Sequence, residues 1–262
     1  MSALDDMSAG SLKLASRIQD GMRTGACWGR DHEQIGPFLA TFNHDDDNPF
    51  LNYAVPDIGA TPSLTDVEDL CAAYRQRDRK PRLEYIPSLA PAVEPVLMSA
   101  DFTVEDRSPV MTCATKADVC VVTAEAVELL APASDDEYQA AAAVQWEAYE
   151  GHGEVPQRAG AGLRKTVEAG GVVVLARDLD TGQPAGAGLC TSPQDGLTEL
   201  SSVGVGAAFR RRGIAAAMAS WLAQHAFASG ATGVFLTAGQ SERIYARAGF
   251  VSHFEMLYIS RV

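Results

Sequence analysis

Basic residues and long apolar runs are scarce in this sequence. Its 21 lysines and arginines stand against 34 aspartates and glutamates, which gives a formal net charge of −13. Nucleic acids are bound by basic faces, so we expect no nucleic-acid partner. No apolar run approaches the about 18 residues of a membrane-spanning helix, so we expect no membrane partner. The first residues carry no basic and apolar signal pattern, which predicts a cytoplasmic protein.

The cysteines lack the spacing of a metal centre or of a disulfide framework. They form no C-x-x-C pair and have no paired histidines nearby. We therefore expect reduced core cysteines and no metal site. The five are Cys27, Cys71, Cys113, Cys120 and Cys190.

The most informative stretch is 197–229, whose pattern predicts a strand, a basic turn and a long helix. The strand covers Leu197–Val205, and the helix from Ile214 carries apolar side chains three or four residues apart. Three arginines and Gly213 lie between them. The first turn of a helix has unpaired N–H groups and a partial positive charge. This unit therefore predicts a site for an anion such as a pyrophosphate.

The pattern Arg210-x-x-Gly213-x-Ala215, five residues after the Val203-Gly204-Val205 strand end, resembles the acetyl-CoA signature of the GNAT N-acetyltransferases. The resemblance implies acetyl-CoA as co-substrate, with the strand backbone on the pantetheine arm and the turn on the pyrophosphate. The alternative is a basic turn that only precedes an amphipathic helix. The implied cofactor-binding residues are Val203, Gly204, Val205, Arg210, Arg211, Arg212, Gly213, Ile214, Ala215 and Ala216.

The segment from Ser241 to Phe250 resembles the last helix and strand of the same family. The resemblance implies that Tyr245 protonates the departing CoA thiolate. A phenol with a pKa near ~10 is a suitable acid for a thiolate with a pKa of about 8.5. The alternative is a tyrosine that only packs between helix and sheet. Ala238 stands where the family often has an asparagine, so a CoA contact from that side chain is absent.

An amine acceptor must lose a proton before it can attack a thioester. Glu199, six residues before Val205, is the candidate base, and strict alternation places it on the face of Val203 and Val205. A bulge, which the family usually has in this strand, would change that face. By analogy, the backbone N–H of Val203 stabilises the oxyanion. One alternative is a water molecule ordered by Ser201 and Ser202 on the strand. The other is a residue on the acceptor side, namely Glu147, Glu150, His152 or Glu154.

The whole chain predicts an α+β fold with two GNAT-like domains. Each has a mixed, mostly antiparallel central sheet flanked by helices, and the N-terminal one is truncated. We place a degenerate, non-catalytic domain at 1–115 and the catalytic domain at 116–262, whose first strand is predicted at Asp118–Val122. The alternative for the first half is an unrelated appendage. In the first half of the chain, the predicted helices are 11–23, 63–80 and 90–99, and the predicted strands are 35–42, 50–55, 82–86 and 102–113.

The two halves show the same order of elements when Phe102 is laid on Phe250. Leu97 then falls on Tyr245, and the arginine-free turn 56–62 falls on the basic turn. We therefore expect the first half to lack both the phosphate cradle and the acid.

We predict an N-acyltransferase that moves an acetyl or other short acyl group from acetyl-CoA to a primary amine by direct transfer in a ternary complex. Cys190 on the adjacent strand is the alternative, covalent nucleophile. We expect a small-molecule amine acceptor and a monomer or homodimer. Two other functions stay open. One is a non-catalytic acyl-CoA-binding regulatory module. The other is an acetyltransferase of protein lysines or N-termini, docked through the N-terminal half.

Overall fold

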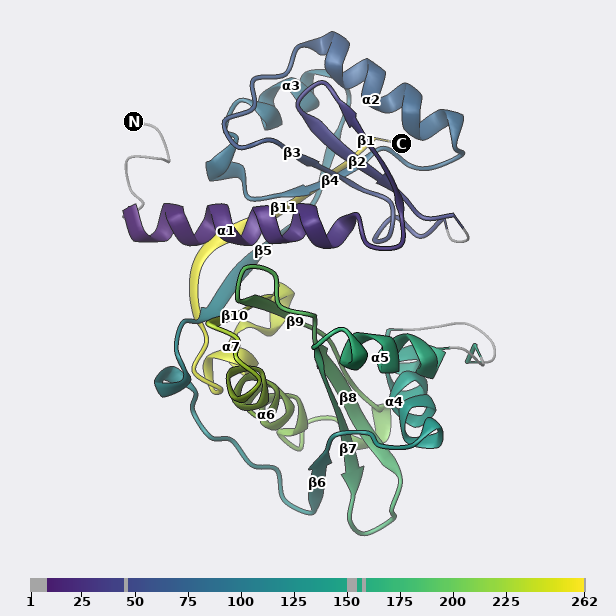
Figure 1. The fold of residues 1–262 in the computed structure, drawn as a ribbon, viewed down its shortest axis with the longest axis vertical. Helices are drawn as coiled ribbons and strands as arrows, with labels where there is room; N and C mark the ends of the chain where they lie inside the picture. Colours follow the sequence, from purple (N-terminus) through teal and green to yellow (C-terminus); the bar gives the residue numbers. More distant parts are fainter. Residues whose placement is uncertain (1–8, 45–46, 150–154, 157–158, 262) are drawn as a thin grey trace. The chain divides into compact units, whose positions relative to one another are not determined.

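The computed structural model is an α+β protein in which helices flank mixed β-structure (Figure 1). It describes residues 9–44, 47–149, 155–156 and 159–261, and within these ranges no helix is both long and apolar enough to span a membrane. The helices are Ala9–Ala26 (α1), Leu64–Gln76 (α2), Val93–Ser99 (α3), Asp135–Ala148 (α4), Ala159–Glu168 (α5), Ile214–Ala228 (α6) and Glu242–Ala246 (α7). The strands are Asp31–Ile35 (β1), Phe38–Phe42 (β2), Ala54–Pro56 (β3), Arg82–Tyr85 (β4), Thr103–Cys113 (β5), Val127–Leu130 (β6), Val172–Asp178 (β7), Pro184–Cys190 (β8), Leu197–Val205 (β9), Gly233–Thr237 (β10) and Val251–Ser260 (β11).

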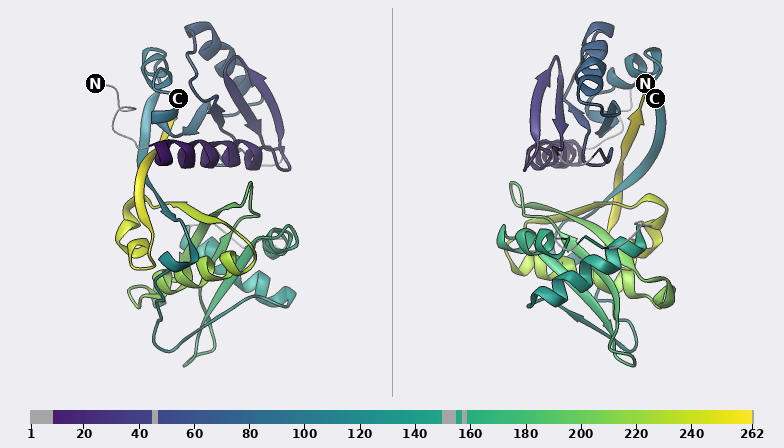
Figure 2. Two further views of the ribbon diagram at one scale, coloured as in Figure 1. Left: turned by 60° about the vertical axis from the view of Figure 1, so that its left-hand side comes forward. Right: turned by 90° about the vertical axis from the view of Figure 1, so that its right-hand side faces the viewer.

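The chain forms two compact units and passes between them along two strands. Unit 1 comprises Met1–Val110 and His253–Val262, and unit 2 comprises Met111–Ser252. The strand order is β1-β2-β3-β4-β11-β5 in unit 1 and β5-β10-β9-β8-β7-β6 in unit 2. Figure 2 shows β5 and β11 running side by side. The C-terminal strand therefore belongs mostly to the sheet of unit 1, whereas the predicted boundary at residue 115 groups it with the second domain.

Unit 2 is built on the antiparallel strands β7, β8 and β9, to which β10 adds in parallel. The run from Val172 to Ala176 is apolar at every position because both faces of β7 are covered. Val174 and Ala176 pack in the core with α6, whereas Val173 and Leu175 pack with α4 and α5. This layering, visible in Figure 1, confirms the predicted mixed, mostly antiparallel sheet flanked by helices.

Unit 1 repeats the pairing of unit 2 in shorter form. β2 and β3 are antiparallel and β3 and β4 are parallel, as are β8 and β9 and then β9 and β10. α2 follows β3 in the chain as α6 follows β9. The expected correspondence between the two halves is therefore present in the strand directions.

The ends of α3 and α7 carry the same hydrogen bond. The N–H of Phe102 donates to the carbonyl of Leu97 at 3.1 Å, and that of Phe250 donates to the carbonyl of Tyr245 at 3.2 Å. The residue before each phenylalanine is left-handed, with φ of 62° and 97°. Both helices thus end in a left-handed cap, which supports laying Leu97 on Tyr245.

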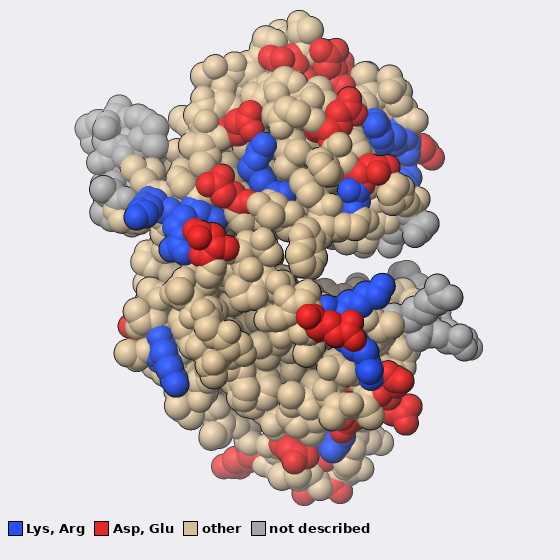
Figure 3. Space-filling model, viewed as in Figure 1, with Lys and Arg blue, Asp and Glu red and all other residues tan. Residues whose placement is uncertain are grey.

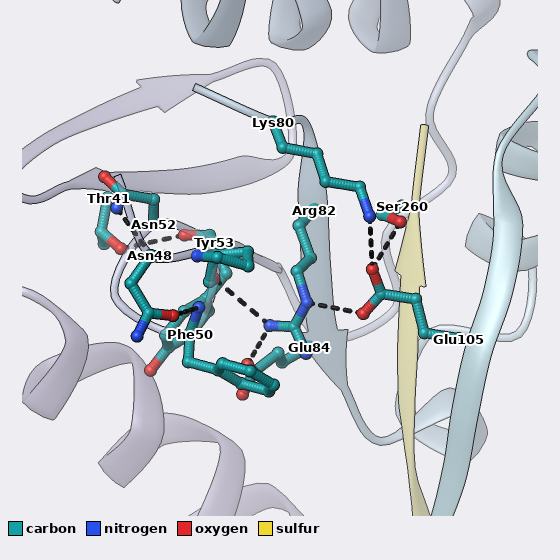
Figure 4. Close-up of polar contacts among 11 residues, drawn as sticks. Thr41, Asn48, Phe50, Asn52, Tyr53, Lys80, Arg82, Glu84, Glu105 and Ser260 are labelled. Atoms are coloured by element: carbon teal, nitrogen blue, oxygen red, sulfur yellow. Dashed lines mark hydrogen bonds and ion pairs between the residues drawn. The ribbon is translucent and has the colours of Figure 1, made fainter. Parts of the chain in front are cut away.

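A cluster of polar contacts holds β11 in unit 1 (Figure 4). Glu105 on β5 accepts hydrogen bonds from Arg82 on β4 at 2.7 Å, from Lys80 at 2.8 Å and from Ser260 on β11 at 2.6 Å. Burial acts to raise the pKa of Glu105, but the bonds from Lys80, Ser260 and Arg82 lower it to about 2. Arg82 is only 1% exposed, and its buried charge is stabilised by ion pairs with Glu84 and Glu105.

The predicted strand at Asp118–Val122 is wrong. Thr115 and Asp118 instead form a capping box around a single 3-10 turn. The N–H of Cys120 then donates to the carbonyl of Ala248 at 3.0 Å. This segment is tied to the end of α7, and in the described residues the next strand after β5 is β6.

Candidate functional site

Strand β9 carries a bulge where the V-x-V pattern begins. Its register with β8 shifts between Ser201 and Gly204, so that Ser202 and Val203 lie opposite the single residue Gly188. Ser202 is left-handed, with φ of 54°, which is uncommon for a residue other than glycine. A bulge of this kind re-aims side chains and backbone groups on the bulged strand.

The bulge decides which side chains share a face of β9. Leu200 lies in the core under α6, and Val203 and Val205 pack against that core. Glu199 is the neighbour of Leu200 and therefore points to the opposite face. Strict alternation would place Glu199 on the face of Val203 and Val205. This expectation does not hold, because the extra residue of the bulge shifts the alternation of side chains between the two faces by one position.

Strand β9 has an open edge beyond Glu199. Its parallel pairing with β10 ends where Glu199 lies opposite Phe235, although β9 continues to Val205. On the other edge, the N–H of Gly206 donates to the carbonyl of Ala185 at 3.0 Å. Alternate residues of a strand direct their N–H and C=O to alternate edges.

Val203 and Val205 therefore direct their backbone groups away from β8. Side chains reach both carbonyls. The Tyr149 hydroxyl donates to the carbonyl oxygen of Val203 at 3.4 Å, and Arg210 Nε donates to that of Val205 at 3.2 Å. The open edge is thus accessible to hydrogen-bonding groups other than a strand.

Two residues of the basic turn have a left-handed backbone. Arg211 and Gly213 are left-handed, with φ of 66° and 80°. Gly213 is the N-cap of α6 and has no side-chain hydrogen bond, and a Cβ placed on it would meet nothing within 4 Å. Arg211, Arg212 and Gly213 line a cavity of about 500 Å³ with Arg247 and the segment 123–126. Positive charge and the start of a helix therefore meet in one cavity.

Arg212 is fixed to the scaffold. Its Nη1 donates to Asp178 Oδ2 at 2.7 Å, and the Asp178 side chain is only 2% exposed. This bond, together with that from Thr181, lowers the pKa of Asp178. The guanidinium also lies 5.7 Å from the ring centroid of Phe209. Arg212 therefore lines the cavity with its charge compensated by Asp178, and it fastens the turn to the end of β7.

Tyr245 on α7 packs partly buried against the core of unit 2. Its ring meets Phe250 edge to face at a centroid distance of 6.3 Å. Burial and the neighbouring Tyr149 raise the pKa of Tyr245 to about 12. The phenol is therefore protonated at neutral pH and can act as a proton donor.

The backbone of Glu199 is bonded to the turn after β8. Its N–H donates to Thr191 Oγ1 at 3.1 Å, and its carbonyl accepts from the Thr191 N–H at 2.9 Å. Neighbouring Cys190 is 1% exposed, and burial, followed by the negative charge of Glu199, raises the pKa of its thiol. A buried thiol of raised pKa is a poor nucleophile, which disfavours the covalent alternative at Cys190.

The end of α4 is fastened to β9 and to the turn after it. Glu147 accepts a hydrogen bond from the N–H of Ala207 at 2.8 Å, and Gln145 Nε2 donates to the carbonyl of Ser202 at 2.9 Å. Glu147 therefore has a structural partner. The other acceptor-side candidates, Glu150, His152 and Glu154, lie outside the described residues.

Gln145 and Tyr149 contact the candidate site, and the sequence did not predict these contacts. They are four residues apart at the end of α4, so they lie on one side of the helix. Both side chains bond to carbonyls of the β9 bulge, those of Ser202 and Val203. The four-residue spacing could have indicated that the two side chains share a side of the helix. It could not have indicated their partners, because these lie more than fifty residues further along the chain.

Unit 1 has a different group at each corresponding position. At the start of α2, the N–H and hydroxyl of Ser63 donate to Asp66 at 2.7 and 2.6 Å, in a complete capping box. The carboxylate would repel an anion. Leu97, which corresponds to Tyr245, is fully buried and has no acid group.

Comparison with known proteins identifies the class of fold. Residues 136–250 match the sequence model of the acetyltransferase (GNAT) family. A GCN5-related N-acetyltransferase from Kribbella flavida is 27% identical and superposes with a TM-score of 0.78 over 94% of this chain and 95% of its own. A search of curated proteins finds no match.

Two more distant structures show the fold alone. A GCN5-related N-acetyltransferase from Sphaerobacter thermophilus is 16% identical, with a TM-score of 0.65 over 86% of this chain and 76% of its own. A tandem GNAT protein from the clavulanic acid biosynthesis pathway, solved without AcCoA, is 11% identical, with a TM-score of 0.59 over 85% of this chain and 77% of its own. The tandem likeness agrees with the repeated strand pattern of the two units.

Proposed function

Since residues 136–250 match the sequence model of the acetyltransferase (GNAT) family, we propose that the protein transfers an acetyl or other short acyl group from acetyl-CoA to a primary amine. The observation that carries the proposal is the presence of three features in the same unit, unit 2. These are the open edge of β9 at Val203–Val205, the arginine-lined cavity at Gly213, and the phenol of Tyr245.

The residues present fit acetyl-CoA. Val203 and Val205 offer backbone groups to the pantetheine arm, and Gly204 between them keeps the strand close to α4. The N–H groups from Arg211 to Ala216 would hold the pyrophosphate, with the charges of Arg210 and Arg212 beside them. Bound there, the co-substrate supplies an activated thioester.

The chain's own groups account for each proton. The amine nitrogen forms a bond to the thioester carbon after a base has taken its proton, and the carbonyl electron pair moves to oxygen. The N–H of Val203 stabilises this oxyanion. When the pair returns, the carbon–sulfur bond breaks and Tyr245 donates its proton to the departing thiolate. The nitrogen, positively charged after the attack, then releases its second proton through water to the Tyr245 phenolate, which leaves a neutral amide and restores the phenol. Glu199, directly or through a water, is the proposed base.

A small cationic amine is the proposed acceptor. The net charge of −13 would attract such a molecule by long-range steering. On the face drawn in Figure 3, acidic and basic side chains are interspersed.

Unit 1, whose α2 start is occupied by the Ser63–Asp66 capping box, is proposed to be non-catalytic.

Thermal unfolding with acetyl-CoA tests the proposed cofactor site. Ligand at about 100 times its Kd should add roughly 2.7 kcal/mol, a rise of several degrees in Tm. Gly213→Glu should abolish the rise because it places a carboxylate at the cavity. Gly59→Glu is the matched control, since Gly59 is also left-handed, with a φ of 74°, and also open around Cβ, but lies before α2.

The same preparation separates the rival functions. Thiol release with a panel of amines supports the transferase. Binding without thiol release would favour the regulatory module, and turnover only with peptides would favour a protein acetyltransferase. The absence of any Tm rise at millimolar acetyl-CoA would overturn the proposal.

A further inference from the structure

Gln145 bonds to the peptide unit that carries the proposed oxyanion donor. Its Nε2 donates to the carbonyl of Ser202 at 2.9 Å, an ordinary hydrogen-bond length. The carbonyl of Ser202 and the N–H of Val203 belong to one planar peptide unit. A bond that fixes the oxygen at one end of this plane therefore also fixes the direction of the N–H at the other end.

The conformation of Ser202 needs such support. Its φ of 54° is left-handed, and left-handed backbone at a residue other than glycine persists only where its surroundings impose it. Gly188, opposite the bulge, cannot pair with both Ser202 and Val203. The hydrogen bond from Gln145 therefore supplies a constraint that the β-ladder lacks at this point.

Helix α4 presents Gln145 from a fixed support. One turn closer to the helix end, Ala148 lies so near Gly204 that a Cβ on the glycine would be 2.7 Å from the alanine Cβ. Glu147 accepts a hydrogen bond from the N–H of Ala207 at 2.8 Å. These contacts hold the last turn of α4 at a set distance from β9, so the Gln145 amide has little freedom.

We propose that Gln145 is a positioning residue that aims the Val203 N–H at the carbonyl oxygen of the bound thioester. The inference rests on the proposed acyl transfer. The bond accepted by Ser202 also polarises the peptide, which strengthens the N–H of Val203 as a donor. Gln145 itself touches neither substrate nor reacting atom in this assignment.

Gln145→Met tests the inference because it keeps the length of the side chain and removes the donor. Loss of a complete oxyanion donor costs about 10²–10³-fold in kcat, so loss of its alignment should cost roughly 10–100-fold. The KM for acetyl-CoA should change by less than about threefold, because the pantetheine and phosphate contacts remain.

Gln139→Met is the matched control on the same helix. Gln139 Nε2 donates to the carbonyl of Pro156 at 3.1 Å, and its Oε1 accepts from the N–H of Gly160 at 3.1 Å. These bonds do not involve β9. The control should therefore lose stability to a similar degree while keeping kcat within about twofold. Adding Ser202→Gly to Gln145→Met should recover part of kcat, because glycine adopts the left-handed backbone readily.

A readout independent of the acceptor is the amide proton resonance of Val203. Acetonyl-CoA, a thioether analogue that keeps the carbonyl, should shift this resonance in the wild type and markedly less in Gln145→Met. A wild type that releases thiol, with Gln145→Met retaining both kcat and the shift, would overturn the inference and leave the proposed function standing. A wild type that neither binds acetyl-CoA nor releases thiol would overturn both.

Discussion

Gly204→Ala should show how closely activity depends on the contact between α4 and β9. The added Cβ would lie 2.7 Å from the Cβ of Ala148, whereas non-bonded carbons prefer about 3.5–4.0 Å. Helix or strand must therefore move by about 1 Å. Such a movement would stretch the 2.9 Å bond between Gln145 and Ser202 beyond hydrogen-bonding range.

We expect a loss of stability of about 1–3 kcal/mol from overpacking and a loss of up to about 10²-fold in kcat from misplacement. The assays are thermal unfolding and acetyl-CoA-dependent thiol release. Ala148→Gly added to Gly204→Ala removes the methyl group that clashes and should restore most of kcat. Ala148→Gly alone should cost only about 0.5–1 kcal/mol. Wild-type turnover in Gly204→Ala, or a folded double variant as slow as the single one, would refute this reasoning.

Two further substitutions probe the acid and the anchor of β11. Tyr245→Phe should lower kcat by at least about 10²-fold and leave the Kd for acetyl-CoA, measured by calorimetry, unchanged. If turnover and affinity for acetyl-CoA fell by the same factor, Tyr245 would instead be a packing residue. Glu105→Gln should destabilise the protein at pH 7 by roughly 2 kcal/mol, allowing for the partial exposure of the side chain. Because the folded state lowers the pKa of Glu105 to about 2, this contribution is present above the ordinary glutamate pKa and is lost as the pH falls towards 2. Urea denaturation should show that the difference in the free energy of unfolding between wild type and variant is smaller near pH 2 than at pH 7. A difference that does not change with pH would contradict the assignment.

Elements whose signal is local were predicted well. The β9 strand and the start of α6 follow from residues within one short stretch. The capping box at Ser63 and Asp66 likewise marks the start of α2. In each case neighbouring residues both carry the pattern and form the contact, so the sequence is sufficient.

Elements fixed by distant partners were not predicted. Asp31–Ile35 is a polar and mostly exposed edge strand, held by its antiparallel pairing with β2. It has no apolar alternation to reveal it. The face of β9 on which Glu199 lies depends on the bulge, and the bulge is defined by the register of β9 with β8. The roles of Gln145 and Tyr149 depend on carbonyls more than fifty residues away. Composition and periodicity contain none of these relations.

The placement of β11 gives unit 1 a structural role. In unit 2 the strand beside β10 is β5, which arrives from the first half, and β11 instead joins β4 and β5 in unit 1. Each half therefore lends its last strand to the sheet of the other. α7, which carries Tyr245, leads directly into β11, and Glu105 fastens Ser260 at the far end of that strand. Unit 1, which we propose to be non-catalytic, can still be required, because it holds the strand that follows the proposed catalytic helix.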